Sequence, residues 1–373
     1  MADKKLDKKS GGNGGGDGSN GLVLLIVWGG IILLLFGGLK TSGFLNQIYV
    51  TNLKSDQKCQ TSNPLCNVIG YAYNGEGLGS SIFHYQKTVD VYQILESSVN
   101  SNLFYAATNH GIFFSQDTGK NWYPFSDLNK KINKDTMINK MIANPASTQE
   151  MFISVSKKNQ GSVYQSDNGL FTLNSLLEFN GDTANDLMIF RGNLYLGLKS
   201  GKILNYSLDA KKSRQIVKLP SSILKLSNVN NAVIYAMTAY SGVFKSTDGI
   251  TFTKIQSPTN VTDIVVSQDN SVIYMTTKNG ILKSSDFGNN FKKLESLPLD
   301  ANKIEKVTAS SANHVYVFGN HQTYESIDGG ISWKAYDNKI SRSISAVVVT
   351  EDRILVGTKS FNFLNLWQSL FQF

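Results

Sequence analysis

Residues 103–122 read LFYAATNHGIFFSQDTGKNW, which contains two apolar strands, a glycine turn between them and an acidic glycine turn that ends at tryptophan. The same order returns at 151–171, 193–209, 233–252, 272–291, 315–333 and, in part, 353–367. Equivalent positions in the seven segments are 39 to 47 residues apart, at Tyr105, Phe152, Tyr195, Tyr235, Tyr274, Tyr316 and Leu355. Such a period indicates a repeat fold in which each unit buries its faces against its neighbours.

Each unit contains more than these two strands. An alternating apolar strand precedes several of them, at Thr88–Leu95, Asn260–Ser267, Lys303–Ser310 and Ser343–Thr350. With a further strand after the acidic turn, the unit becomes a four-stranded meander, which is the blade of a β-propeller. We therefore predict an all-β, seven-bladed propeller over residues 81–373, with six or eight blades also compatible with the spacing. Because the seventh unit is short after Trp367, a strand near Ile82–Gln86 is expected to complete its outer edge.

Five of the acidic turns share a Ser-x-Asp-x-Gly pattern, two of them complete with tryptophan and two a residue shorter. The residues concerned are Ser115, Asp117, Gly119, Trp122, Asp167, Gly169, Asp248, Gly249, Asp286, Gly288, Asp328, Gly330 and Trp333. The third and seventh units lack the pattern. No copy has the alternating acidic ligands of a calcium loop, and the four histidines have no metal-ligand spacing. We predict no metal and no cofactor.

The pattern resembles the Asp-box (BNR) propellers, a group that includes sialidases, sortilin-type ectodomains and photosystem II assembly-factor-like proteins. The resemblance covers about residues 85–373. It implies that these turns join the third and fourth strands of a blade, away from the ligand face. Their expected role is architectural, because Ser and Asp side chains satisfy turn N–H groups, Gly supplies positive φ and the aromatic ring fills the seam between blades.

The N-terminal end predicts a membrane anchor. Residues 1–20 include a Gly-rich tail that is expected to be flexible. Gly21–Leu39 reads GLVLLIVWGGIILLLFGGL, with no charge over 19 residues. A helix of this length crosses a hydrocarbon core of about 30 Å. We predict an uncleaved transmembrane signal anchor, and a cleaved signal peptide is the alternative, although no small-x-small site follows the run cleanly.

Residues 40–80 are expected to form a stalk that leads into the propeller. They contain the only two cysteines, Cys59 and Cys66, in the polar loop CQTSNPLC. A disulfide between them fits an oxidising compartment, and two unpaired thiols are the alternative. Lysines on the two sides of the apolar run nearly balance, so the orientation rests mainly on the cysteines. We predict a cytoplasmic N-terminus and an extracytoplasmic propeller.

The charge balance favours an anionic partner. The net charge is +8, and four lysines and three aspartates in the first 17 residues leave +7 for the rest of the chain. Only 4 of the 36 basic residues are arginine, which argues against sequence-specific nucleic-acid reading, because lysine lacks the bidentate fork. Basic residues in the turns between second and third strands and in the connections between blades are expected to meet on one face. The turns contribute His110, Lys157, Lys158, Lys199, Tyr240, Lys278, His321 and Lys359. The connections contribute Lys130, Lys131, Lys134, Lys303, Lys339 and Arg342.

The resulting prediction is a non-catalytic propeller that binds a protein or an anionic glycan at the extracytoplasmic surface. In the alternative interpretation, these lysines and asparagines are ordinary solvent-exposed residues of surface turns and bind no partner. Sialidase activity is not indicated, because a sialidase needs three arginines that converge on the substrate carboxylate. A glycoside hydrolase that uses two carboxylates is the second function considered. Its candidate acids are Asp127, Asp135, Asp182, Asp186 and Asp300.

Overall fold

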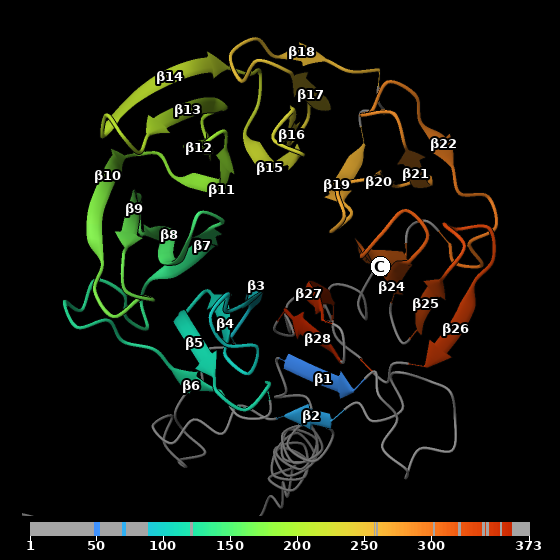
Figure 1. Cartoon of the computed structure of the whole chain (residues 1–373), viewed down its shortest axis with the longest axis horizontal. Helices are drawn as coiled ribbons and strands as arrows, with labels where there is room; N and C mark the ends of the chain where they lie inside the picture. Colours follow the sequence, from blue (N-terminus) through green and yellow to red (C-terminus); the bar gives the residue numbers. More distant parts are fainter. Residues whose placement is uncertain are drawn as a thin grey trace, which may run out of the picture. The chain divides into compact units, whose positions relative to one another are not determined.

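The computed structural model of the chain describes residues 48–52, 69–71, 89–119, 122–256, 258, 260–300, 303–319, 322–337, 340, 343–350 and 353–359. These residues form seven four-stranded antiparallel sheets (Figure 1). The predicted membrane span Gly21–Leu39 and the cysteines Cys59 and Cys66 lie outside the described residues. Within the described ranges, no helix has the length and apolarity that a membrane crossing requires.

Six sheets are blades made of four consecutive strands, numbered here from the innermost strand outward. Blade 1 contains β3 (Val91–Glu96), β4 (Phe104–Thr108), β5 (Gly111–Ser115) and β6 (Tyr123–Pro124). Blade 2 contains β7 (Met137–Asn144), β8 (Ser147–Lys157), β9 (Gln160–Ser166) and β10 (Asn174–Asn180). Blade 3 contains β11 (Ala184–Phe190), β12 (Asn193–Leu198), β13 (Lys202–Ser207) and β14 (Lys212–Lys218).

The next three blades repeat this order. Blade 4 contains β15 (Ile223–Val229), β16 (Val233–Thr238), β17 (Val243–Ser246) and β18 (Thr253–Lys254). Blade 5 contains β19 (Val261–Val266), β20 (Ile273–Thr277), β21 (Gly280–Ser284) and β22 (Lys292–Lys293). Blade 6 contains β23 (Ile304–Ala309), β24 (Val315–Gly319), β25 (Gln322–Ser326) and β26 (Lys334–Asp337).

The seventh sheet is composite and joins two distant parts of the chain. Its inner strands are β27 (Ile344–Val349) and β28 (Arg353–Thr358), and its outer strands are β1 (Ile48–Asn52) and β2 (Ile69–Tyr71). β1 pairs with β28 along five residues. A strand that precedes the repeats therefore completes the last unit, as the short seventh repeat predicts. The strand is not the one predicted, because β1 takes this position and Ile82–Gln86 lies outside the described residues.

The fold is thus an all-β propeller with six continuous blades and this composite sheet, where the spacing predicted seven blades with six or eight as alternatives. Innermost strands of neighbouring sheets contact one another in cyclic order, and β27 contacts β3 to close the ring. Figure 1 shows these strands facing the centre. Closure removes exposed sheet edges from the ends of the repeat array.

The hydrophobic core lies in the seams between sheets. Seven buried clusters are present among the described residues, and each combines side chains of two neighbouring sheets. One contains Tyr105 of blade 1 with Met141 of blade 2, and another contains Tyr235 of blade 4 with Met275 of blade 5. The seven equivalent positions of the repeat all lie in second strands and are all buried, which confirms the repeat alignment.

A β-bulge occurs near the start of the innermost strand in all seven described sheets. The register shifts there between residues 91 and 93, 138 and 140, 184 and 186, 223 and 225, 261 and 263, 304 and 306, and 344 and 346. Because a bulge adds a residue to one strand, it re-aims the side chain next to it.

At three of the bulges, the bulged side chain donates to a backbone carbonyl of the next sheet in the ring. The Asn139 amide donates to the Ala184 carbonyl at 3.1 Å, and the Asn185 amide donates to the Ile223 carbonyl at 2.8 Å. Ser345 Oγ donates to the Val91 carbonyl at 2.5 Å, across the point where the ring closes. We call these contacts the inner clasps. They fix where the next innermost strand begins.

Gln93 follows the bulge of blade 1 and makes a two-point contact with buried Met141. Its Nε2 donates to the Met141 carbonyl at 2.9 Å, and its Oε1 accepts from the Met141 N–H at 3.0 Å. Gln93→Ala is expected to destabilise the protein by about 1 to 3 kcal/mol, because buried polar groups lose their partner. The measurement is the urea midpoint of unfolding. Gln160→Ala, at an exposed position of β9, is the matched control, and equal shifts in both variants would contradict this role.

Candidate functional site

One end of the ring gathers the loops that the sequence predicts to form a binding face. We call it the loop face: the turns between second and third strands together with the connections into first strands. These two sets of loops are bonded to each other by backbone hydrogen bonds. Gly111 N–H donates to the Thr136 carbonyl at 2.7 Å, Lys199 N–H donates to the Thr183 carbonyl at 2.9 Å, and Gly181 N–H donates to Asn159.

The structure brings most of the predicted basic residues to the loop face. Exposed side chains there are Lys130, Lys131, Lys134, Lys157, Lys158, Lys199, Lys278, Lys303 and Lys359. His110 is half-buried, and its Nδ1 lies 2.9 Å from the Lys134 carbonyl oxygen. His321, Lys339 and Arg342 lie outside the described residues. The placement agrees with the expected face, and its use as a binding site remains a prediction.

Several acids on the loop face shape its loops. Asp127 is 2 % exposed, and its carboxylate accepts from the N–H groups of Lys131 and Ile132. The Asp182 carboxylate accepts from the N–H groups of Thr183 and Ser200. These two acids therefore order the backbone that presents the neighbouring lysines.

Exposed apolar side chains also lie at the loop face. Tyr240, in the turn between β16 and β17, is 85 % exposed, and its backbone N–H donates to Ser221 Oγ at 3.2 Å. Leu224 is 46 % exposed and Met137 is 40 % exposed, both near the start of innermost strands. Sequence reasoning found Tyr240 and missed the other two. Leu224 is the bulged residue of β15, and alternation assigned from sequence cannot locate a bulge.

The residues that follow the bulges include an alternating series of charges, which we call the inner charge ring. Lys140 Nζ lies 3.1 Å from the Asp186 carboxylate, and Lys225 Nζ lies 2.7 Å from the Asp263 carboxylate. Lys306 Nζ lies 3.5 Å from the other oxygen of Asp263. Among the five acids considered for glycoside hydrolysis, Asp186 belongs to this ring, whereas Asp263 was not predicted.

Both carboxylates of the inner charge ring have close partners, and those of Asp263 affect its pKa. The Leu226 N–H also donates to Asp186, at 2.7 Å. Burial pushes the pKa of Asp263 upward, but the charges of Lys225 and Lys306 outweigh burial and hold that pKa below its usual value. A general acid for glycoside hydrolysis requires a carboxyl with a raised pKa. The ion pairs at Asp263 instead lower the pKa of its carboxyl group.

The five Ser-Asp turns share one hydrogen-bond pattern. The serine Oγ accepts a backbone N–H in each turn, and at Ser115, Ser246, Ser284 and Ser326 the donor is the turn glycine, at 2.7 to 2.9 Å. The same hydroxyl donates to the carboxylate two residues later. At Asp286, hydrogen bonds from Asn290 and Ser284 lower the pKa to about 2.

Blade 2 departs from the predicted assignment of this turn. Ser166 Oγ donates to Asn168 Oδ1 at 3.0 Å, so Asn168 occupies the place assigned to Asp167. The amide that donates to Ser166 belongs to Leu170 and not to Gly169. Asp167 is exposed and accepts from Gln165 instead. The sequence assignment was one residue too early, because Asp167 and Asn168 are adjacent and both residue types suit this turn position.

The two tryptophans of the acidic turns pack at the seams between sheets, as the expected architectural role requires. Trp122 is 4 % exposed, packs in the seam between blade 1 and the composite sheet, and donates from Nε1 to the Gly119 carbonyl. Trp333 packs beside the cluster that joins blades 5 and 6. The turns lie at the outer part of each blade and at the end opposite the loop face, because they connect third and fourth strands.

Removing one charge of the inner ring tests its energetic role. Asp263→Asn is expected to destabilise the protein by about 3 to 5 kcal/mol, because Lys225 and Lys306 then lack their buried anion. Since the folded-state pKa of Asp263 is lowered, its carboxylate stabilises the fold at neutral pH. That contribution is lost as the pH falls through the lowered pKa.

Chemical denaturation at several pH values measures this effect. The stability difference between wild type and Asp263→Asn should shrink below about pH 4. Asp209→Asn, at an exposed position between β13 and β14, is the control and should cost little at any pH. A difference that stays constant down to pH 2 would argue against the ion pairs as its cause.

The comparisons with known proteins agree with this architecture. The family model described as "DUF6242 beta propeller domain" matches residues 172–323, which is less than half of the chain and extends from β10 into β25. A comparison with curated protein sequences gives no match.

Solved structures with the same fold have different activities. YCF48 bound to D1 peptide is 14% identical with a TM-score of 0.59, over 73% of this chain and 92% of that one. YCF48 from Cyanidioschyzon merolae is 13% identical with a TM-score of 0.54, over 72% of this chain and 95% of that one. The GH74 xyloglucanase from Xanthomonas campestris is 12% identical with a TM-score of 0.59, over 73% of this chain and 51% of that one. The chain therefore spans about half the length of the xyloglucanase, and these identities establish the fold alone.

Proposed function

We propose that this chain is a non-catalytic scaffold whose loop face binds an acidic, extended segment of a partner protein. The observation that supports this proposal best is the exposed ring of Tyr240 among the lysines of one face. Aromatic side chains are enriched at protein interfaces and among the residues that contribute most to binding. The lysines supply a complementary field for acidic residues.

Two backbone N–H groups anchor the turn that presents Tyr240 to the connection into blade 4. Ala239 N–H donates to the Ser222 carbonyl at 2.9 Å, and Tyr240 N–H donates to Ser221 Oγ at 3.2 Å. A fixed backbone lowers the entropy that ordering an aromatic anchor would cost on binding. Leu224, which is 46 % exposed, lies two residues from Ser222 and enlarges the apolar part of the face.

A propeller of similar extent offers a precedent for a peptide ligand. One solved structure is YCF48 bound to D1 peptide, and the match covers 92% of that chain. The glycoside hydrolase alternative has its own neighbour in the xyloglucanase, of which this chain spans half. Between the two, Asp263 favours binding, because its ion pairs lower its pKa whereas a general acid needs a raised one.

We also propose that Gly21–Leu39 anchors the chain in a membrane and that the propeller is extracytoplasmic, with a disulfide between Cys59 and Cys66. The uncharged span and the cysteine pair support this. Extraction of membranes with alkaline carbonate, followed by protease treatment of intact cells, measures both parts. Release of the protein by carbonate would contradict the anchor, and full protection from protease would contradict the orientation.

Reversing the charge of the loop face tests the partner chemistry. Replacement of Lys157, Lys158, Lys199 and Lys278 by Glu is expected to abolish binding of an acidic, fluorescein-labelled 15-residue peptide, measured by fluorescence polarisation. Wild-type binding should weaken steeply with salt, because exposed charges are screened. Tyr240→Ala should weaken it about tenfold or more, as loss of an aromatic hot spot costs at least 1.4 kcal/mol.

The matched control makes the same change of charge elsewhere. Lys211, Lys212, Lys254 and Lys292 are exposed on turns and outer strands away from the loop face, and their replacement by Glu should leave a large part of the binding intact. Equal loss in both quadruple variants would show that net charge alone governs binding. No preference of the wild type for acidic over neutral peptides would refute the proposal.

A further inference from the structure

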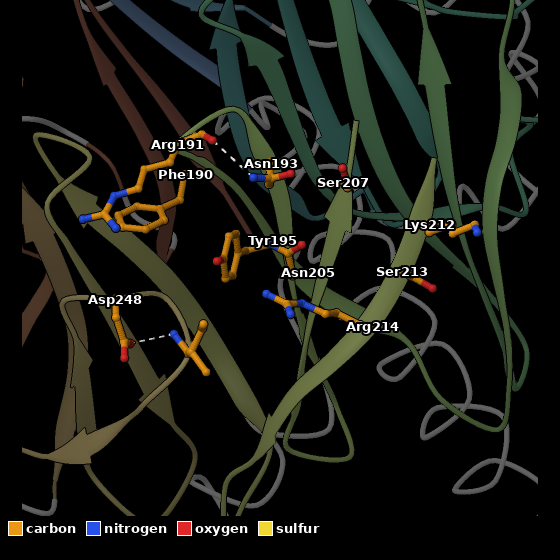
Figure 2. A pocket seen from close by; sticks show the side chains of 11 residues that line it. Phe190, Arg191, Asn193, Tyr195, Asn205, Ser207, Lys212, Ser213, Arg214 and Asp248 are labelled. Carbon is orange, nitrogen blue, oxygen red and sulfur yellow. Dashed lines mark hydrogen bonds between the residues drawn. The ribbon is translucent and has the colours of Figure 1, made fainter. Parts of the chain in front are cut away.

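A cavity of about 440 Å³ lies between blades 3 and 4, at the end of the ring opposite the loop face (Figure 2). Blade 3 contributes the turn after β11, the second strand β12, and the facing ends of β13 and β14. Blade 4 contributes its Ser-Asp turn, at Asp248 and Ile250. The cavity is therefore separate from the loop face and from the inner charge ring.

The cavity exists because blade 3 has a short side chain at a position where blades 4 and 5 have a lysine. In blades 4 and 5 the second-strand tyrosine is paired with Lys245 and with Lys283, respectively. Lys245 Nζ donates to the Phe287 carbonyl at 2.7 Å, and Lys283 Nζ donates to the Gly329 carbonyl at 3.0 Å. Each lysine thus spans the seam to the turn of the next blade. In blade 3 the paired residue is Asn205, which is too short to span it.

A second difference adds an arginine. Blade 3 lacks the Ser-Asp turn, and its outermost strand β14 has seven residues, whereas β6, β18 and β22 have two. The longer strand places Arg214 in register with Asn205. Figure 2 shows the Arg214 side chain extended toward Tyr195 and Asn205, into the cavity. Two of the four arginines of the chain, Arg191 and Arg214, line this one cavity.

Among the described residues, some polar side chains that face the cavity already have hydrogen-bond partners, and others have none. Arg191 is held at the rim, because its guanidinium donates to the carbonyls of Asn231 and Thr247 and lies over the Phe190 ring. Asn205 is only 7 % exposed as a residue, and its side-chain amide makes no hydrogen bond to the described residues, while its polar atoms are not fully enclosed. The Arg214 side chain likewise makes no hydrogen bond within the described part of the chain.

A largely buried amide that has no partner in the protein completes its hydrogen bonds with water or with a ligand. The nearest acid of the lining, Asp248, is already engaged, because its carboxylate accepts from the N–H groups of Ile250 and Thr251 and from Ser246 Oγ. The Tyr195 hydroxyl donates to the Gly249 carbonyl, so its ring forms a fixed wall. The lining thus combines the Arg214 guanidinium, the Asn205 amide, an aromatic wall and the apolar side chain of Ile250 with the polar residues Asn193, Ser207, Lys212 and Ser213.

We propose that this cavity binds a hydroxylated carboxylate of the size of one acidic monosaccharide. A guanidinium fork matches a carboxylate through two parallel hydrogen bonds. The amide of Asn205 both donates and accepts, which suits a hydroxyl group. A ring wall suits the apolar face of a sugar, and the volume lies within the range of small-molecule sites.

The test uses the full chain purified in detergent and three probes: D-glucuronate, D-glucose and inorganic phosphate. Saturation-transfer NMR and calorimetric titration should detect saturable binding of glucuronate, with glucose and phosphate at least tenfold weaker. Arg214→Ala should weaken glucuronate binding at least tenfold. Lys292→Ala, at an exposed position of β22, should leave it unchanged.

Asn205→Lys is the sharpest variant, because it installs the side chain that blades 4 and 5 already have at this position. It should fold with a melting temperature at or above that of the wild type and should lose glucuronate binding. If this variant unfolds, Arg214→Ala decides alone. The proposal is overturned if the wild type shows no saturable glucuronate binding, if glucose or phosphate binds as well, or if neither variant weakens binding.

Discussion

The arrangement of the propeller depends on one repeated contact, in which a side chain at the start of an innermost strand binds the backbone of the next sheet. Asn139, Asn185 and Ser345 each make such an inner clasp. A single blade cannot bury both of its faces, so the seams supply its core. Apolar packing is non-directional and leaves neighbouring sheets free to slide. The clasps are directional, and they bring the loop face and the inner charge ring into register around the ring.

Much of this fold is predictable from periodicity, because strands alternate and blades repeat. The innermost strands predicted at Asn260–Ser267 and Ser343–Thr350 differ from β19 and β27 by one residue at each end. The bulges, and with them the clasps, were not predictable, since a bulge interrupts the period of two and residues as different as Asn139, Leu224 and Ser345 occupy the bulged position. The closing strands escaped prediction too, because Ile48–Asn52 precedes the repeats and resembles none of them.

The candidate sites also divide into those that the sequence predicted and those that only the structure shows. Lysines in turns were identified because a turn residue is exposed whatever the exact register, as Lys157 and Lys199 illustrate. Sites that depend on pairing between strands required coordinates. The contact of Asp263 with Lys225 and Lys306 joins three blades, and the cavity beside Asn205 is recognised only when its partner Arg214 and the equivalent Lys245 are known. A single sequence does not show that the Asn205 side chain is too short to span the seam, whereas the structure shows the cavity that remains beside it.

The composite sheet has a consequence for how this protein is made. β1 pairs with β28, about 300 residues later in the chain. At a synthesis rate of about 5 to 20 residues per second, β1 emerges from the ribosome about 15 to 60 seconds before its partner. During that time the early blades can assemble seam by seam, but the ring stays open and β1 has an unpaired edge that other strands can join. Protection of the first strands during translation is therefore a requirement of this topology, set by the place in the sequence at which the ring closes.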